Sequence, residues 1–232
     1  MKFTVGIPTY NRYDHFLRDL VDLLSEYPEV ERIIIVDDAS SDYQKIVDRS
    51  WDKVSVYRNE NNLGCYLNKL KVLSYLEEDE WCILFDSDNS FGRPYIDPIL
   101  NEDVTVGLNK NTAYLPTIAG SFNYDFMSGI TVTPTEWNEK FRPCHAEWNT
   151  CNFLLHSSLA KKILETKTTY YDDILPYNKD ACFINFLIAR SKGDIKFVPD
   201  MKYEHRIHDQ GHNYFAEEDQ GNSFFEIWDW NL

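Results

Sequence analysis

An alternation of short apolar runs with helical patterns over the first hundred residues constrains the fold of this chain more than any other feature. The apolar runs are FTVGI at 3–7, RIIIVDD at 32–38, VSVY at 54–57 and CILF at 82–85. Apolar residues recur at helical spacing over 16–27, 43–48 and 63–76. Apolar strands that alternate with amphipathic helices are typical of βαβ units with a covered parallel sheet. The pattern predicts an α/β protein with a mostly parallel central sheet flanked by helices.

The second half of the chain is less regular and predicts a smaller, mixed β region. Strand-like runs occur at 103–108, 112–118, 129–133, 152–156, 194–199 and 201–208. Helices are predicted from 133 to 141, from 157 to 165 and from 179 to 193. The last of these has apolar residues at helical spacing and Gly193 as a stop signal.

Composition and charge narrow the classes of function. The 232-residue chain has a formal net charge of −15, from 38 acidic and 23 basic residues. This argues against a nucleic-acid polymer as the main partner, because phosphate contacts need a clustered basic surface. Five cysteines without a CxxC pair are typical of free thiols in a reducing compartment. The chain shows no signal-peptide pattern and no transmembrane window of about 20 apolar residues, so we expect a cytoplasmic protein.

Three of the four predicted strands of the first half end in polar residues. PTYNR directly follows the first run, DDASSD begins with the last two residues of the second, and DSDN follows the fourth. In parallel sheets, ligands bind beyond the carboxyl ends of the strands. This coincidence is the first indication of function in the sequence.

Asp86 and Asp88 stand two residues apart, directly after a predicted buried strand. At a strand end that leads into a loop, both carboxylates can converge on one ion. Carboxylates with few other protein ligands suit Mg²⁺ or Mn²⁺, which complete their shell with water and phosphate oxygens. The pair therefore predicts a divalent-metal site. The alternative is that both aspartates cap the next helix or are solvated in a loop.

Asp37 and Asp38 also end a predicted strand, and one of them could accept a hydrogen bond from a ribose hydroxyl or a base N–H. The alternative is that Asp37, Ser40 and Ser41 hold a turn and cap the next helix. Neither GxGxxG nor GxxxxGK[ST] occurs in the chain, which argues against a dehydrogenase or a P-loop enzyme. A metal ion would then have to neutralise the charge of a bound diphosphate.

The chain resembles the nucleotide-binding half of family 2 glycosyltransferases in four motifs, VGIPTYNR, IIIVDDASSD, NNLGCYLNK and WCILFDSDN. The second half is similar to the family's stretch in which an acidic pair opens a helix and a Tyr-Arg-x-His strand follows; here it reads YDDILPYNKDACFINFLIARSKGDIKFVPDMKYEHRIH. The resemblance covers most of Lys2–His212 and implies a single GT-A domain over 1–232. Residues 1–100 would bind the donor, and 101–215 would bind the acceptor and hold the catalytic base. Residues 216–232 would form an aromatic, acidic tail.

The resemblance implies a nucleotide pocket built from the first half. Pro8 and Tyr10 would line the base pocket, and Asp38 would bind the base or the ribose. Lys69 would stand where the family usually has an arginine, and it would also contact the nucleotide sugar.

The same resemblance places the diphosphate and the metal ion at the DSD triplet. Asp86 would face the ribose and the metal, Ser87 would contribute to the nucleotide-sugar site, and Asp88 would ligate the metal. Arg206 would contact the diphosphate, and His208 would be a third metal ligand. The alternative for His208 is a loop residue. The implied cofactor is Mn²⁺ or Mg²⁺.

Asp180 falls where the family has its catalytic base, with Lys179 in place of the usual preceding Glu. Family members of this kind invert the anomeric centre by a direct displacement, in which a carboxylate deprotonates the acceptor hydroxyl as that hydroxyl attacks the sugar C1. An aspartate at a helix N-terminus is stabilised as the anion, so plain capping is the alternative. Asp172 and Asp173 are the nearest rivals for the role.

Taken together, the residues and the resemblance imply a metal-dependent inverting glycosyltransferase with a nucleotide-sugar donor, expected to be uridine-linked, and a glycan or other hydroxyl acceptor. Trp137, Trp148 or Tyr124 could stack on an acceptor sugar, with ordinary packing as the alternative. One rival function is a nucleotidyltransferase that makes a nucleotide sugar, although GIPTYNR lacks the glycine-rich, basic loop of that class. Another rival is a catalytically inactive nucleotide- or sugar-binding module.

Overall fold

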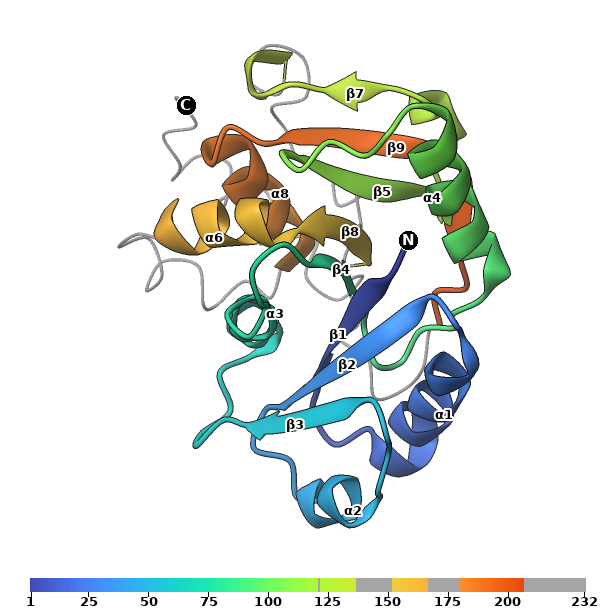
Figure 1. Ribbon diagram of the computed structural model, residues 1–232. Helices are drawn as coiled ribbons and strands as arrows, with labels where there is room; N and C mark the ends of the chain where they lie inside the picture. The colour runs from blue at the N-terminus through green and yellow to red at the C-terminus, as the bar shows by residue number, and fades with distance from the viewer. Residues whose placement is uncertain (121, 137–151, 167–179, 207–232) are drawn as a thin grey trace.

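The computed structural model describes residues 1–120, 122–136, 152–166 and 180–206, and these form one sheet with helices on both faces (Figure 1). The strands are β1 (Phe3–Thr9), β2 (Val30–Asp37), β3 (Val54–Arg58), β4 (Trp81–Leu84), β5 (Thr112–Ala119), β6 (Phe122–Asn123), β7 (Thr131–Val132), β8 (Phe153–His156) and β9 (Asp194–Tyr203). The helices are α1 (Arg18–Glu26), α2 (Tyr43–Asp48), α3 (Cys65–Leu73), α4 (Arg93–Thr105), α6 (Ser157–Thr166) and α8 (Asp180–Arg190). A π-helical turn (Tyr13–Leu17) precedes α1, and a 3₁₀ turn (Asp125–Met127) follows β6.

The described strands lie in the order β3-β2-β1-β4-β8-β5-β9-β7, and β6 pairs with β5. The pairs β2–β3, β1–β2 and β1–β4 are parallel, which confirms the βαβ units predicted for the first half. β8 is antiparallel to both β4 and β5, whereas β5 and β9 are parallel. The second half therefore adds the predicted mixed β region to the same sheet.

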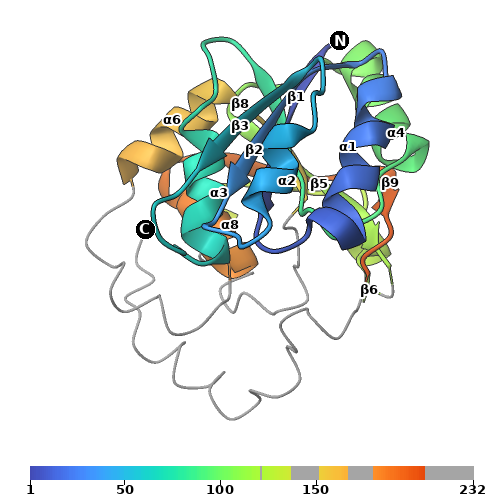
Figure 2. The same cartoon turned by 90° about the horizontal axis from the view of Figure 1, so that it is seen from below.

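Two apolar cores lie on opposite faces of this sheet. Ile33 and Ile35 of β2 belong to the core that α1, α2 and α4 cover. Ile34 and Val36 point the other way, into the core that α3, α6 and α8 cover. Figure 2 shows α1 and α4 together on one side and α3, α6 and α8 on the other. Because each buried Val or Ile side chain contributes about 1.5–3 kcal/mol, the doubly apolar strands fix this layered arrangement.

Gly6 sets how closely α3 approaches β1. A Cβ atom at this position would lie 2.3 Å from Cγ1 of Val72, which is closer than real atoms pack. Glycine therefore lets α3 pack directly on the strand. As a consequence, Lys69 of α3 lies close to the loop that follows β4.

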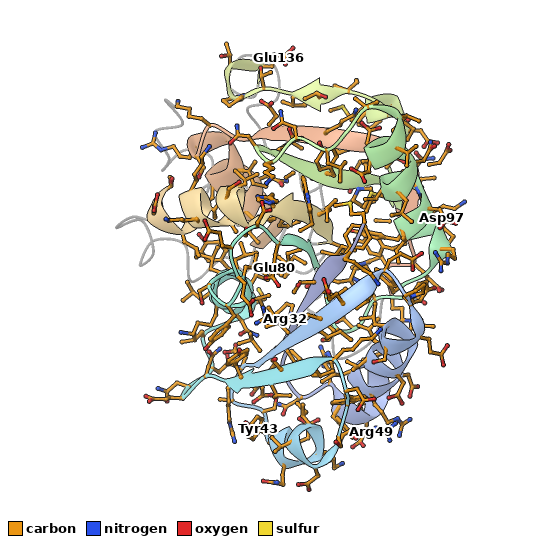
Figure 3. All side chains as sticks on the ribbon, viewed as in Figure 1. Arg32, Tyr43, Arg49, Glu80, Asp97 and Glu136 are labelled. Atoms are coloured by element: carbon orange, nitrogen blue, oxygen red, sulfur yellow. The ribbon has the colours of Figure 1, made fainter. Side chains whose placement is uncertain are left out.

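An ion-pair network ties the amino ends of the strands to the segment before β4. Arg32 donates to Glu77 at 2.9 Å and to Glu80 at 3.2 Å, and Thr4 donates to Glu80 at 2.9 Å. Figure 3 shows Arg32 and Glu80 close to one another at this end of the sheet. None of the described helices is long and apolar enough to span a membrane.

The structure corrects two predicted strands of the second half. The strand expected at 103–108 is wrong, because α4 continues to Thr105. Proline in its first turn starts this helix, and Tyr95, Ile96 and Ile99 anchor it in the core at helical spacing. The burial of these earlier residues of α4 therefore outweighs the local β-propensity of DVTVGL.

The strands expected at 194–199 and 201–208 are instead one strand, β9, which ends at Tyr203. Asp200 has a φ of 61°, and the register with β5 shifts between Pro116 and Ile118, so an irregularity replaces the expected break. The helix predicted from 133 to 141 lies mostly outside the described residues, and the tail at 216–232 lies entirely outside them.

Candidate active site

The candidate site is built at the carboxyl ends of β1, β2, β3 and β4. These strands are parallel neighbours, so the segments that follow them meet at one edge of the sheet. The contacts between these loops, given below, confirm that PTYNR, DDASSD and DSDN come together.

Asn11 joins the loop after β1 to the loop after β2. Its backbone N–H donates to Ser40 Oγ at 2.8 Å, and its side-chain Oδ1 accepts from the backbone N–H of Ser41 at 2.8 Å. Its φ is 53°, a left-handed conformation that asparagine tolerates better than most residues. Tyr13 adds a bond from its backbone N–H to the Asp42 carboxylate at 3.1 Å. The two loops therefore form one rigid rim.

Asp37 is fully buried and holds the turn that follows β2. Its Oδ2 accepts from the backbone N–H of Ser40 at 3.0 Å and lies 3.6 Å from Nε of Arg58. Burial raises the pKa of this carboxyl group, and the hydrogen bonds from Ser40 and the charge of Arg58 oppose that rise. The turn-holding alternative for Asp37 and Ser40 thus agrees with the observed contacts.

Asp38 is also buried, and its carboxylate organises the segment that follows β3. It accepts hydrogen bonds from Asn59 Nδ2 at 2.8 Å, from the backbone N–H of Leu63 at 2.8 Å and from that of Gly64 at 2.9 Å. Gly64 has a φ of 82°, which favours glycine, and directly precedes α3. Asp38 therefore positions the start of the helix that carries Lys69.

The two residues predicted to line a base pocket differ in exposure. Pro8 is buried in β1, where it pairs with Val36 of β2. Tyr10, two residues further on, is 46% exposed at the rim. Of the two, only Tyr10 presents a large surface to a ligand.

Asp86 is held from two sides. Lys69 Nζ lies 2.8 Å from Asp86 Oδ1, and the Lys69 side chain is only 2% exposed. The backbone N–H of Asp86 donates to Oδ1 of the fully buried Asn152 at 2.6 Å. The carboxylate itself is 21% exposed. It is therefore fixed in place and still open to solvent.

Asp88 faces the loop after β1, where Nε of Arg12 lies 3.7 Å from its Oδ2. Its side chain is 26% exposed, and the intervening Ser87 is buried. The second carboxylate of the triplet is therefore also open to solvent and also paired with a basic side chain.

The loop after β4 is joined to the end of β9. The backbone N–H of Arg206 donates to Oδ1 of the buried Asn89 at 3.3 Å, and its guanidinium donates to Ser90 Oγ at 3.2 Å. Ser90 and Glu204 also form an isolated β-bridge. Arg206 thus lies beside the loop that carries the DSD triplet.

For the remaining predicted residues, the structure gives only an element or the burial, or does not describe the residue. Asp180 is the first residue of α8, at the start of its first turn. Tyr124 is buried, which agrees with the packing alternative. Five predicted residues lie outside the described part of the chain: Trp137, Trp148, Asp172, Asp173 and His208.

The donor chemistry of the DSD triplet fits a divalent cation. Asp86 and Asp88 offer carboxylate oxygens on one short loop, and both keep part of their surface exposed. Mg²⁺ and Mn²⁺ take such ligands and fill the other positions with water and phosphate oxygens. Over the described ranges, no cluster of three or more His, Cys, Asp or Glu side chains could hold a metal. Further ligands would have to come from a substrate or from residues outside those ranges.

Comparison with solved structures shows which fold this arrangement belongs to. The chain is similar to S. aureus TarS 1–349 in complex with UDP-GlcNAc, with a TM-score of 0.65 at 16% identity, over 91% of this chain and 60% of that one. It is similar to GalNAc-T7 with UDP, GalNAc and Mn²⁺, with a TM-score of 0.61 at 15% identity, over 98% of this chain and 48% of that one. The likeness shows the GT-A fold.

A third solved structure is the mannosyltransferase PcManGT from Pyrobaculum calidifontis in complex with GDP-Man and Mn²⁺. Here the TM-score is 0.57 at 15% identity, over 90% of this chain and 58% of that one. In the sequence, residues 4–103, less than half of the chain, match the model of Glycosyl transferase family 2. This segment of the chain is thus similar to glycosyltransferase family 2. No curated protein sequence matches the chain, and the chain spans 60% of the length of TarS 1–349.

Three residues of this candidate site were not among the predicted ones. Arg12 is the last residue of the motif PTYNR, and its position just after a predicted strand could have marked it as a site residue. Asn89 follows the DSD triplet directly, so it too lay within a recognised motif. Asn152 carries no local signal, because its contact with Asp86 depends on β8 pairing with β4.

Proposed function

We propose that this chain is a metal-dependent, inverting glycosyltransferase that transfers a sugar from a nucleotide-sugar donor, uridine-linked by expectation, to a hydroxyl acceptor such as a glycan. The proposal depends on one observation: a DSD triplet with two partly exposed carboxylates lies beside the loops after β1 and β2 in a family 2 segment. The similar proteins support the donor class, since TarS was solved with UDP-GlcNAc and PcManGT with GDP-Man and Mn²⁺.

The nucleotide would lie against the rim formed by the loops after β1 and β2. Tyr10 is exposed there and would stack on the base, next to the buried Pro8. Asp38 already accepts three hydrogen bonds, and a carboxylate has room for about four, so one acceptor position would remain for the base or the ribose. Lys69 would contribute positive charge at the base of the pocket.

Asp86 and Asp88, with His208 as a third ligand, would hold Mn²⁺ or Mg²⁺ at the diphosphate. Such an ion supplies charge stabilisation for the departing nucleoside diphosphate. Arg206 would add a second positive charge, because its guanidinium lies beside the triplet at Ser90. Ser87 between the two aspartates would help to shape this pocket.

Asp180 would be the catalytic base. Asp180 is the first residue of α8, and an aspartate at a helix N-terminus is favoured as the anion. It would therefore act as a base only toward an acceptor hydroxyl held within reach. The hydroxyl oxygen forms a bond to the sugar C1 while the bond from C1 to the diphosphate oxygen breaks. Attack from the opposite face inverts the anomeric centre. Residues 1–100 would thus bind the donor, and 101–215 the acceptor.

A screen for slow hydrolysis of nucleotide sugars tests the proposal, since hydrolysis needs no acceptor. We expect release of the nucleoside diphosphate from one donor in the presence of Mn²⁺, and its loss in Asp88→Asn. Asp97→Asn is the matched control, because Asp97 lies on α4 with a 60% exposed side chain (Figure 3). Hydrolysis of no donor, or equal hydrolysis by wild type and Asp88→Asn, would refute this function. Binding of nucleotide sugars without turnover would favour the inactive binding module.

A further inference from the structure

Each carboxylate of the DSD triplet is paired with a basic side chain of the same protein. Lys69 lies 2.8 Å from Asp86 and comes from α3, on one face of the sheet. Arg12 lies 3.7 Å from Asp88 and comes from the loop after β1. Two negative and two positive side chains therefore share the place where a divalent cation would bind.

The burial of these basic groups makes the pairing more than a surface contact. Lys69 is 2% exposed and Arg12 is 16% exposed, whereas their acidic partners are 21% and 26% exposed. A buried ammonium group needs a counter-charge, because burying an unpaired ion is costly. Lys69 and Arg12 thus neutralise the triplet and repel a further cation at short range.

We infer that Lys69 and Arg12 are resident counter-cations of the DSD triplet, which keep its affinity for a free divalent cation low until a nucleoside diphosphate is present. The diphosphate oxygens would offer the two basic groups new partners. Asp86 and Asp88 would then be released toward the metal ion. This inference depends on the proposed function, because it assumes that a diphosphate binds at this site.

The scaffold favours such an exchange of side-chain partners. The backbone of Asp86 is fixed by Asn152 at 2.6 Å, and Asn89 is bonded to the backbone of Arg206 at 3.3 Å. The loop can therefore stay in place while its carboxylates change partners. Arg12 belongs to the rim that Asn11 joins to the loop after β2, so a nucleotide held by that rim would lie next to it.

The inference is tested by Mn²⁺ binding to the full chain, measured by electron paramagnetic resonance with and without UDP, GDP or dTDP. We expect weak binding of Mn²⁺ alone and much tighter binding with one of the diphosphates. Lys69→Met and Arg12→Met should each tighten nucleotide-free Mn²⁺ binding by about tenfold, because each removes one repelling charge. Lys69→Arg keeps the charge and should leave nucleotide-free Mn²⁺ binding weak.

Arg93→Met is the control for net charge, since Arg93 pairs with Glu29 near the amino end of β2. It should leave Mn²⁺ binding unchanged. If Lys69→Met fails to fold, Arg12→Met decides, because its partner lies on the more exposed side of the triplet. Nucleotide-free affinities equal to wild type in the charge-removing variants would overturn the inference, as would equal wild-type affinity for Mn²⁺ with and without nucleotide. Failure of every diphosphate to bind would instead refute the proposed function.

Discussion

Asn152 accepts a 2.6 Å hydrogen bond from the backbone N–H of Asp86, and this bond joins the second half of the chain to the DSD triplet. Asn152 directly precedes β8, which runs antiparallel to β4 with Leu84 opposite Phe153. Its side chain is fully buried, and its Nδ2 donates to none of the described residues. The position of the first carboxylate therefore depends on a residue that follows it by 66 positions in the chain.

Replacing Asn152 by alanine should destabilise the fold and misplace Asp86. The backbone N–H of Asp86 would lose its acceptor, which costs about 1–3 kcal/mol of unfolding free energy for a buried group. Urea denaturation measures this loss, and titration with Mn²⁺ and nucleotide should show weaker binding in the folded variant. Asn101→Ala, at an exposed position of α4, should change neither quantity. Unchanged metal and nucleotide binding in Asn152→Ala would contradict a positioning role.

Replacing Asp180 by asparagine should abolish transfer and spare donor binding. The amide cannot take a proton from the acceptor hydroxyl, and general base catalysis contributes typically about 10²–10⁴-fold in rate. Transfer assays measure the loss, and calorimetry with the nucleotide measures donor binding. Transfer at the wild-type rate would mean that the base is another residue, and Asp172→Asn and Asp173→Asn would then be the next variants.

Replacing Gly6 by alanine should destabilise the contact between β1 and α3. The new methyl group would meet Val72 Cγ1 at 2.3 Å, and overpacking of this kind costs about 1–3 kcal/mol. Gly92→Ala is the control, because its Cβ would lie 3.4 Å from the nearest atom in an extended backbone. We expect the control to lose about 0.5 kcal/mol or less by thermal or urea unfolding. Equal losses in both variants would argue against the close packing of α3.

His156 should make the stability of the fold depend on pH. Burial, followed by the charge of Lys110, lowers the pKa of this imidazole below its ordinary value of 6.5, although Asp79 lies 3.2 Å from its Nε2. As the pH falls below 6.5, the unfolded chain takes up a proton that the folded chain resists. The free energy of unfolding contributed by His156 is therefore present above this pH and falls below it.

Urea unfolding of wild type and His156→Gln at about pH 7.5 and about pH 5.5 measures this contribution. The wild type should lose more stability between the two values than the variant does. If His156→Gln lost as much stability between the two pH values as the wild type or more, the predicted loss of stability through His156 at low pH would be contradicted.

The strands of the first half could be predicted because their signals are local. FTVGI, RIIIVDD, VSVY and CILF are apolar on both faces, and all four are strands at nearly the predicted positions. Their parallel order brings the polar ends together, so the meeting of Asp38, Asp86 and Asp88 at one edge followed from pattern alone. The pairing of Asp86 with Lys69 and of Asp88 with Arg12 did not follow from that pattern.

The contacts missed from the sequence are those that depend on tertiary pairing. The 3.7 Å pair of Arg12 with Asp88 needs β1 and β4 to be adjacent, and Asn152 needs β8 to pair with β4. The strand prediction at 103–108 was wrong for a related reason. Tyr95 and Ile99 pack α4 into the core, and the helix continues to Thr105 in a segment of high β-propensity.

Calorimetric titration of UDP, GDP and dTDP into the protein, with Mn²⁺ and then with chelator, tests the central claim most directly. The account predicts that one of the three nucleotides binds to wild type and that chelator weakens this binding strongly. Asp88→Asn should lose the same metal dependence, whereas Asp97→Asn should keep it. If none of the three bound under either condition, the DSD triplet would not be a donor site and the proposed glycosyl transfer would be wrong.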